Sequence, residues 1–332
     1  MLSVVVTFRN RPGLSLRLAN LLSKFLPPTQ LVRLVRALRG KGRFGKLLVK
    51  VFDPNELRRH FRRPRSPRFV DVAGPHWTMM VDVNDHIGYR MAITNVPFER
   101  SLEFLNDALG ESEKKTILDI GAHIGSASIP VCATNHLKLI AFEASKKTAE
   151  LLQRNVSRNS VEAQIFQVAV VDEDHGENIT FKANLGNEGA NSIYSAWNPG
   201  IRENDLFESV PSMSLDGLSR FFSTPEIKLV KIDVEGAEEL VFKGGRNFLG
   251  ENDAPIVFEY RLDGVSRYLG YNLDNVVSLL SEAGYRLFAL QKAPFRFSSF
   301  VPHMSYENVV ALKPDTEAWA RLLPLIAEES SH

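Results

Sequence analysis

Apolar runs alternate with helix-like repeats along residues 115–314 of this 332-residue chain. A short apolar run such as Thr116–Ile120 is typical of a strand that a parallel sheet buries on both faces. The expected strands are 116–120, 138–143, 164–171, 227–233, 255–260, 285–290 and 308–313, and the expected helices are 126–134, 146–158, 237–248 and 273–283. This alternation predicts an α/β fold whose doubly wound, mostly parallel sheet has seven strands and helices on both faces.

The segments on either side of this region have different patterns. Leu31, Leu34, Val35 and Leu38 give residues 29–40 the spacing of an amphipathic helix. The expected organisation is a basic helical extension with a linker at 1–68, a small hairpin with a lead-in helix at 69–114, the main domain at 115–314, and a C-terminal helix or tail at 315–332.

Local patterns add detail to this organisation. Alternating apolar stretches at 78–83 and 89–93 predict the small hairpin, and 98–109 is expected to be the lead-in helix. Residues 172–212 interrupt the strand–helix alternation because they are rich in glycine and polar residues. They predict a hairpin and a long loop over the ligand end of the sheet, where loops of this length are usually functional.

The bulk composition is that of an ordinary globular protein, with 44% hydrophobic and 24% charged residues. Cys132 is the single cysteine, so an intrachain disulfide is excluded and a reducing compartment is indicated. No apolar run approaches the roughly 20 residues that a membrane-spanning helix needs. We therefore expect a cytoplasmic protein.

The net charge of +1 conceals a strongly basic N-terminal region. Residues 1–70 contain 17 of the 40 Lys and Arg residues and only two acids, Asp53 and Glu56. The helix at 29–40 either packs on the main domain, which we favour, or makes peripheral contact with an anionic membrane surface. Residues 58–68 are dense in Arg and Pro and predict a linker or exposed arm. Nucleic-acid binding there is an alternative that we do not expect, and the oligomeric state is not predicted.

A candidate nucleotide-type site follows the strand at 116–120. Asp119, Gly121 and Gly125 form a D-x-G-x-x-x-G pattern between this strand and the next helix, and glycines there let a ligand approach the backbone. The dinucleotide fingerprint G-x-G-x-x-G is absent because His123 stands where its second glycine would be. An NAD oxidoreductase is therefore the least favoured interpretation. The pattern resembles motif I of S-adenosylmethionine-dependent methyltransferases.

A second acidic residue, Glu143, ends the next expected strand, 24 residues after Asp119. Ligands of open α/β sheets bind beyond the carboxyl ends of the strands, so Glu143 is expected to face the ligand. Its carboxylate can accept hydrogen bonds from both hydroxyls of a ribose. Ala169 and Val170, near the end of the third strand, are expected by position to border the adenine.

The segment VKIDVEGAEE at 230–239 concentrates acids at the end of another strand. Asp233 and Glu238 are the candidates for chemistry, whereas Glu235 and Glu238 could also simply complement a helix dipole and Glu239 could be solvated. Clustered carboxylates raise one another's pKa, which suits a general base. With Glu259 they could instead hold a hard divalent cation, an alternative that the sequence does not by itself predict.

Taken together, these segments resemble the FkbM family of S-adenosylmethionine-dependent methyltransferases. The matching pieces are ILDIGAHIG, IAFEASKKTAELLQRNVSRN, QVAVVDEDHGE, SMSLDGL, LVKIDVEGAEELVFKGG and PIVFEY, in family order over residues 116–290. Two departures are His123, where family members commonly have Asn, and Ala144, where they have Pro. The resemblance implies a Rossmann-like class I methyltransferase fold with an antiparallel final strand.

The resemblance also implies roles for individual residues. The turn containing Asp119, Gly121, Ala122 and Gly125 would bind the cofactor, S-adenosylmethionine, around its methionine portion. The ribose would be bound by Glu143, the reacting methyl group would lie near Asp233, and the substrate side would carry Glu235 and Glu238. His123 is a candidate ligand contact or a simple turn residue.

The expected activity is O-methylation of a hydroxyl group on a sugar, a glycan or a small metabolite. Residues 187–198, with Ser192, Tyr194 and Trp197, are a candidate substrate grip or an anchored loop. The alternatives are a nucleic-acid-directed methyltransferase that uses the basic N-terminal region, and a non-catalytic module that binds the cofactor.

Overall fold

The computed structural model describes residues 30, 32–33, 67–174, 178–183, 192–193, 206–260, 273–291, 295–302, 304 and 306–327. The described residues fall into two compact units, and the larger, formed from residues 73–80, 97–184 and 188–332, contains the candidate site. Two predictions fall largely outside the described residues. Of the helix predicted at 29–40, only residues 30, 32 and 33 are described, and they are helical. Of the loop predicted at 187–198, only residues 192–193 are described, and they form a strand.

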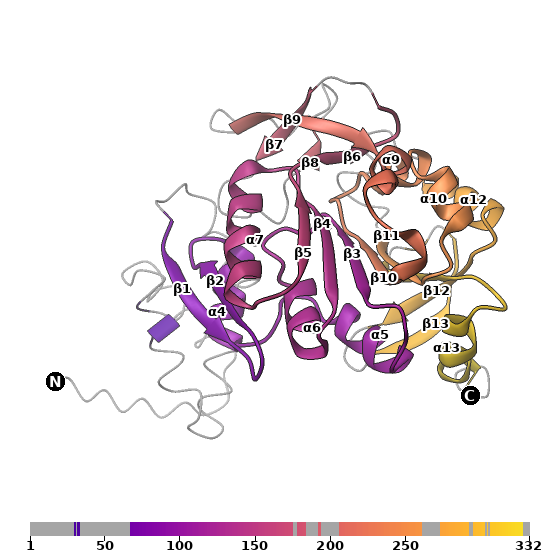
Figure 1. Cartoon of the computed structure of the whole chain (residues 1–332), viewed down its shortest axis with the longest axis horizontal. Coiled ribbons are helices and arrows are strands. Elements are labelled where there is room, and N and C mark those ends of the chain that lie inside the picture. Colours follow the sequence, from indigo (N-terminus) through magenta and orange to yellow (C-terminus); the bar gives the residue numbers. More distant parts are fainter. Residues whose placement is uncertain are drawn as a thin grey trace, which may run out of the picture. The chain divides into compact units, whose positions relative to one another are not determined.

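An eight-stranded sheet forms the centre of the larger unit (Figure 1). Its strands in spatial order are β13 (Arg296–Ser299), β12 (Arg286–Gln291), β14 (Tyr306–Leu312), β11 (Ile256–Tyr260), β10 (Ile227–Ile232), β3 (Thr116–Ile120), β4 (Lys138–Phe142) and β5 (Ala163–Phe166). The strands from β11 to β5 are parallel, and β14 is antiparallel to both of its neighbours. The predicted mostly parallel α/β fold is confirmed, but the predicted count of seven is one too low because β13 folds back on β12.

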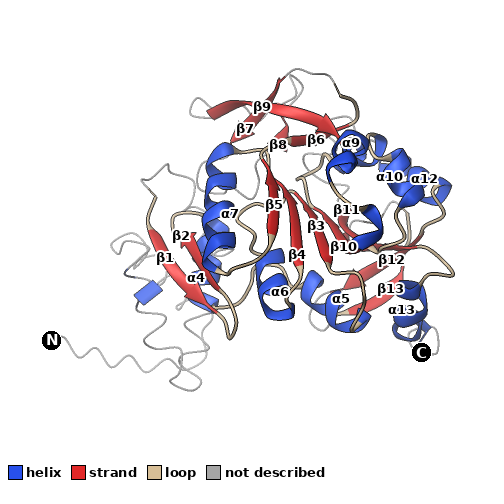
Figure 2. Ribbon diagram, viewed as in Figure 1, coloured by secondary structure: helices blue, strands red, loops and turns tan. Residues whose placement is uncertain are grey.

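The helices of this unit form two packed groups (Figure 2). In one, α5 (Ser101–Leu109) contacts α6 (Ser128–Asn135) and α13 (Glu317–Ala327); in the other, α9 (Glu238–Lys243) contacts α10 (Arg246–Glu251) and α12 (Leu273–Glu282). The strand order reverses at β3, which has β4 on one side and β10 on the other. Right-handed crossovers place helices on opposite faces on the two sides of such a reversal, and ligands bind where it occurs.

The core confirms that the central strands are buried on both faces. Every residue of β3 and β10 is buried, and five of their apolar side chains pack into one cluster with those of α9, α10 and α12: Leu118, Ile120, Ile227, Val230 and Ile232. Helix α7 (Lys146–Arg158) has the predicted bounds and buries its apolar residues beside β5. The core thus fixes the strand ends that carry the candidate site.

Two predicted elements are each divided in two. The strand expected at 164–171 is β5 in the main sheet and β6 (Ala169–Val171) in a separate sheet, because the chain leaves the main sheet after Phe166. The helix expected at 237–248 is broken between α9 and α10 at Gly244 and Gly245. A Cβ atom on Gly244 would lie 2.1 Å from the carbonyl oxygen of Val171, so the break lets β6 approach closely.

The region before the main domain also differs from its prediction. β1 (Phe69–Ala73) and β2 (Thr78–Asp82) form a two-stranded sheet, but residues 89–93 belong to α4 (His86–Thr94) and are not a strand. Asp85 caps this helix, since its Oδ2 accepts from the backbone N–H groups of Ile87 at 2.8 Å and Gly88 at 3.1 Å. The cap favours a helix over the alternating pattern.

The region that interrupts the alternation forms most of a four-stranded sheet. Its order is β6, β9 (Leu206–Ser214), β7 (Asn178–Ala183) and β8 (Ser192–Ile193). β7 and β8 pair antiparallel, so the hairpin predicted within residues 172–212 is present. A search of the described residues for a helix with the length and apolarity to cross a membrane finds none.

Candidate functional site

The turn after β3 is held directly against the turn after β10. The backbone N–H groups of Gly121 and Ala122 donate to the carbonyl oxygen of Phe142 at 2.9 and 3.0 Å. Gly121 has a φ of 79°, and a Cβ atom there would lie 1.9 Å from the carbonyl oxygen of Asp233. Only glycine allows this approach, so the glycine turn and the acidic segment form one site at the carboxyl ends of neighbouring strands.

The second glycine of the motif has a different role. Gly125 has a φ of 81°, and a Cβ atom on it would lie 2.4 Å from Cδ1 of Ile129 and 2.9 Å from Cδ1 of Leu152. Gly125 therefore allows α6 and α7 to pack closely against the turn. This packing holds the turn against the two helices.

His123 and Glu143 meet through the backbone of His123. The His123 residue lies in the left-handed region with a φ of 51°, and its N–H donates to Glu143 Oε2 at 2.9 Å. Glu143 Oε1 accepts from the N–H of Ser145 at 2.9 Å. Burial raises the pKa of Glu143 to about 7 even though these two N–H groups oppose the rise, and the charges of Asp119 and Glu208 add to it.

A buried lysine joins the two acidic ends, and sequence reasoning missed it. Lys231 Nζ lies 3.5 Å from Asp119 Oδ1 and 3.2 Å from Asp233 Oδ2. Burial opposes its charge, but first Asp233 and then Asp119 raise the pKa of Lys231 above its ordinary value. The available signal was the lysines within a strand whose other residues are all apolar, because a buried charge requires a counter-charge.

Asp119 and Asp233 differ in exposure although they share this lysine. The Asp119 side chain is 0% exposed, and among the described residues neither of its carboxylate oxygens has a hydrogen-bond donor. The Asp233 side chain is 38% exposed and can therefore meet a ligand. The expectation that Asp119 contacts the methionine portion stays a prediction; its observed contact is the ion pair with Lys231.

Glu238 folds back over the turn that precedes it. Its Oε1 accepts from the N–H groups of Val234 at 3.1 Å and Gly236 at 3.3 Å, and Glu235 in this turn has a φ of 53°. Glu238 is 3% exposed. Burial raises its pKa to about 7, and Asp233 adds to the rise, although the hydrogen bonds from the backbone lower it. A carboxylate with this pKa can accept a proton near neutral pH.

Glu239 is a structural residue. It is buried, its Oε1 accepts from Asn275 Nδ2 at 2.8 Å, and the same oxygen lies 2.6 Å from Lys243 Nζ. The interpretation of Glu239 as a solvated side chain is therefore wrong. Its contacts attach α9 to α12 and thereby fix the helix that carries Glu238.

The acidic segment, together with Glu259, also carries carboxylate oxygens that could coordinate a hard cation. One carboxylate oxygen from each of Asp233, Glu238 and Glu259 lies within 4.8 Å of the others. Oxygen ligands suit Mg²⁺ or Ca²⁺, whereas Lys231 already supplies one positive charge to Asp233. General base and cation ligand both stay predictions for this cluster.

Ala169 and Val170 lie in β6 after the chain has left the main sheet. Ala169 packs against Val210, and Val170 packs into the main core. These contacts account for the two side chains without a ligand. The expectation that this segment borders the adenine stays a prediction. If it holds, the contact would come from the backbone at the end of β5 and not from these two side chains.

Comparison with known proteins matches the chain to a family and to several solved structures. Residues 119–287, half of the chain, match the Methyltransferase FkbM domain family. A search of curated proteins finds no match to the chain. Similar solved structures include the methyltransferase FkbM from Methylobacillus flagellatus KT, with 15% identity and a TM-score of 0.39 over 67% of this chain and 52% of that chain, so this chain spans about half the length of that relative.

Two further solved structures are among the matches. Precorrin-6y C5,15-methyltransferase from Geobacter metallireducens GS-15 has 15% identity and a TM-score of 0.34, over 64% of this chain and 86% of that chain. TYW2 from M. jannaschii, solved in complex with AdoMet, has 11% identity and a TM-score of 0.35, over 74% and 86% of the two chains. The match to the family over half of the sequence establishes the relationship: the chain belongs to the FkbM family of S-adenosylmethionine-dependent methyltransferases.

Proposed function

We propose that this protein transfers the methyl group of S-adenosylmethionine to a hydroxyl oxygen of a sugar, a glycan or a small metabolite. The observation that carries the proposal is the 1.9 Å approach that a Cβ atom on Gly121 would make to the carbonyl oxygen of Asp233. The family's cofactor turn and its acidic segment are therefore in direct contact. Carboxylates beside a methyl donor suit an acceptor that must lose a proton as it reacts.

The cofactor-binding role is assigned to the turn from Gly121 to Gly125 together with Glu143. Each carboxylate oxygen of Glu143 accepts one backbone N–H and has a second acceptor site for a ribose hydroxyl. Because the pKa of Glu143 is raised to about 7, hydrogen bonds donated by the ribose would favour its ionised form. Glu143 thus contributes most to binding when it is ionised.

The chemical step assigned to the acids is removal of the acceptor's proton. The hydroxyl oxygen forms a bond to the methyl carbon as the bond between carbon and sulfur breaks, and the sulfonium becomes a neutral thioether. The hydroxyl proton passes to the carboxylate of Glu238 or Asp233. Lys231 holds Asp233 in position at 3.2 Å, so positioning and one proton transfer are the main contributions of the protein.

The first test is cofactor binding by the full chain, measured by calorimetric titration with S-adenosylhomocysteine. We expect saturable binding that Glu143→Ala removes. Binding that survives in Glu143→Ala would remove the ribose assignment, and no binding by the wild-type protein would refute the whole proposal.

The second test is methyl transfer to panels of glycans and hydroxylated metabolites, detected by mass spectrometry. Asp233→Asn and Glu238→Gln should retain binding of S-adenosylhomocysteine and lose turnover by about 100-fold, the lower range for a general base. The matched control is Glu251→Gln, since Glu251 is an exposed glutamate on α10. Undiminished turnover in both variants would remove the catalytic assignments.

A second candidate acceptor is RNA, favoured by the 17 Lys and Arg residues among the first 70. Binding through these residues would be strongly salt-dependent, because it releases counterions from phosphates. Measuring RNA affinity between low and physiological salt separates the two candidates. Absence of RNA binding at low salt would leave the hydroxyl of a small molecule or glycan.

A further inference from the structure

A cavity of 80 Å³ lies at the amino ends of three central strands, away from the candidate methyl-transfer site. Its lining includes Lys228 near the start of β10 and Ala254 and Pro255, which precede β11. The methyl-transfer site is at the carboxyl ends of the same strands. Strands of five or six residues separate the two sites by roughly 17–20 Å.

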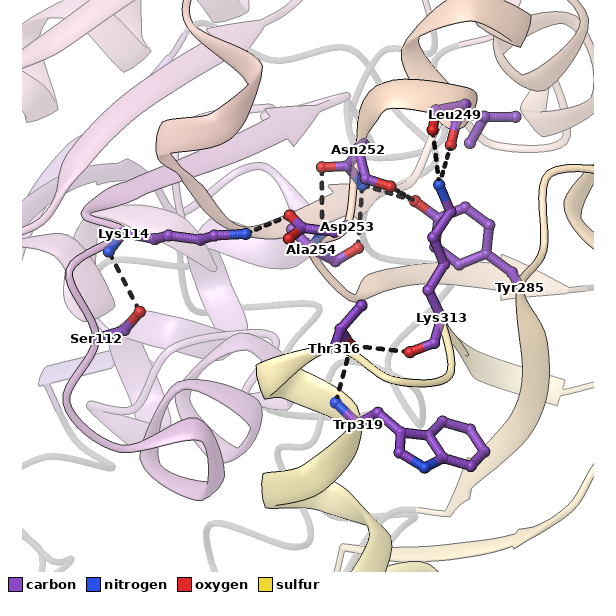
Figure 3. Close-up of polar contacts among 11 residues, drawn as sticks. Ser112, Lys114, Leu249, Asn252, Asp253, Ala254, Tyr285, Lys313, Thr316 and Trp319 are labelled. Atoms are coloured by element: carbon purple, nitrogen blue, oxygen red, sulfur yellow. Dashed lines mark hydrogen bonds and ion pairs between the residues drawn. The ribbon is translucent and has the colours of Figure 1, made fainter.

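Three cationic side chains line this cavity, and two of them have acidic partners. Lys114 pairs with Asp253, as Figure 3 shows, and Arg321 NH2 lies 2.6 Å from Glu317 Oε1. Asp253 and Glu317 also line the cavity. The charges of Lys114 and Arg321 are therefore balanced within the protein.

Lys228 is the third cation, and its partners are neutral. Its Nζ donates to Asn106 Oδ1 at 2.7 Å and to the carbonyl oxygen of Gly110 at 2.8 Å. Lys228 is 7% exposed. A lysine ammonium has three donors, so one donor is left over from these two hydrogen bonds, and the acids that act on its charge, Asp107 and Glu317, do so without a hydrogen bond or ion pair to Nζ among the contacts given for the described residues. A buried charge in this state is costly unless an anion accompanies it.

An irregularity in the sheet gives Lys228 this position. β10 pairs Ile227 with Thr116 and Leu229 with Ile117, so the register shifts at Lys228. An extra residue of this kind redirects a side chain, and such irregularities occur preferentially near functional sites. Burial is the main cause that lowers the pKa of Lys228; the charges of Lys115 and Arg321 lower it further, and those of Asp107 and Glu317 oppose them.

We propose that this cavity, here named the Lys228 cavity, binds a small oxyanion, either inorganic phosphate or a carboxylate group, with the ammonium of Lys228 as its charged anchor. The volume of 80 Å³ is enough for one such group beside the ammonium. Ser112 lines the cavity and accepts from the N–H of Lys114 at 3.2 Å, so its hydroxyl proton is available to the oxyanion.

The test is calorimetric titration of the full chain with inorganic phosphate and, separately, with acetate. Chloride keeps the ionic strength constant, and saturating S-adenosylhomocysteine occupies the methyl-transfer site. We expect saturable binding of at least one of the two anions by the wild-type protein. Lys228→Met should weaken it about tenfold or more, because a charge-assisted hydrogen bond is lost.

The matched control is Lys313→Met. Lys313 Nζ also donates to two neutral carbonyl oxygens, those of Leu249 at 2.7 Å and Gly250 at 3.0 Å, but Lys313 does not line the cavity (Figure 3). This control should bind the anion as tightly as the wild type. If Lys228→Met fails to fold, Lys228→Gln replaces it, since its amide removes the charge and keeps N–H donors for Asn106 and Gly110.

Three results would overturn the proposal. They are absence of saturable binding of both anions, equal binding by wild type and the cavity variant that folds, and binding lost equally in Lys313→Met. Binding of phosphate alone would identify a phosphate site, and equal binding of acetate would identify a carboxylate site. Because the methyl-transfer site is occupied throughout, these outcomes are independent of the proposed methyl transfer.

Discussion

Replacement of Glu238 by glutamine should make the folded protein more stable at pH 8.5 while it removes methyl transfer. Glu238 is 3% exposed, and its Oε1 accepts from two backbone N–H groups. The amide oxygen of glutamine can accept the same two hydrogen bonds without a negative charge. The substitution therefore removes a buried charge and retains the contacts that hold the side chain.

The expected gain follows from the pKa of Glu238. This pKa is raised from 4.5 to about 7, and each pKa unit corresponds to about 1.4 kcal/mol. The ionised carboxylate therefore costs the folded state about 3 kcal/mol. The burial of the amide offsets part of this, so we expect the free energy of unfolding to rise by about 2 kcal/mol. The melting temperature should rise by roughly 4–8 °C.

The gain should depend on pH in a defined direction. Below about pH 4.5 the carboxyl is protonated in both the folded and the unfolded protein, so the substitution should have little effect. Between about pH 4.5 and 7 the unfolded chain ionises while folded Glu238 stays protonated, so the wild type loses stability relative to the variant. Above about pH 7 the difference should be constant.

The assay is chemical denaturation of Glu238→Gln, Glu251→Gln and the wild type at pH 5 and pH 8.5. The exposed control should not change the free energy of unfolding by more than about 0.5 kcal/mol at either pH. A loss of stability in Glu238→Gln at pH 8.5 would contradict the raised pKa. A gain that is equal at both pH values would show that packing, and not ionisation, is responsible.

Three further predictions concern the residues that hold the two turns together. Lys231→Met should destabilise the protein by about 3–5 kcal/mol in denaturant titrations, because it leaves Asp119 buried and charged; Asp119→Asn in the same chain should restore much of the loss. Gly121→Ala should abolish binding of S-adenosylhomocysteine in calorimetry, because its Cβ would overlap the carbonyl oxygen of Asp233; intact binding would show that the turns can separate. Affinity for S-adenosylhomocysteine should fall below about pH 7 as Glu143 becomes protonated, and Glu143→Gln should remove this dependence.

Sequence patterns predicted the central strands well because burial on both faces leaves a continuous apolar run. They missed β13, whose four residues, RFSS, include one fully buried side chain, Phe297. A strand this short is defined by its pairing with β12, which no local pattern records. The helix predicted across Gly244 and Gly245 was divided for a similar reason, since the close approach of β6 is a tertiary contact.

The candidate site was predictable in its chemistry but not in its ion pairs. The glycines and acids were visible because their spacing places them at strand ends. The ion pair of buried Glu239 with half-exposed Lys243 and that of Lys231 with Asp119 were not, because both depend on which side chains meet after folding. The sequence alone therefore does not distinguish the role of Asp233 from that of Glu239. The exposure and the contacts of the two side chains in the structure do.

Two lysines of β10 show how the same physical rule leads to different conclusions at the two ends of one strand. Lys231 is buried between two carboxylates, so its charge is accounted for within the fold, and its function is to position Asp233. Lys228 is equally buried but has only an amide oxygen and a backbone carbonyl oxygen as acceptors. No carboxylate lies within ion-pair distance of this ammonium among the described residues, and in the proposal above an anion from outside the chain fills that place. At one end of β10 the charge of Lys231 is balanced by two carboxylates of the protein. At the other end, the proposed anion would balance the charge of Lys228.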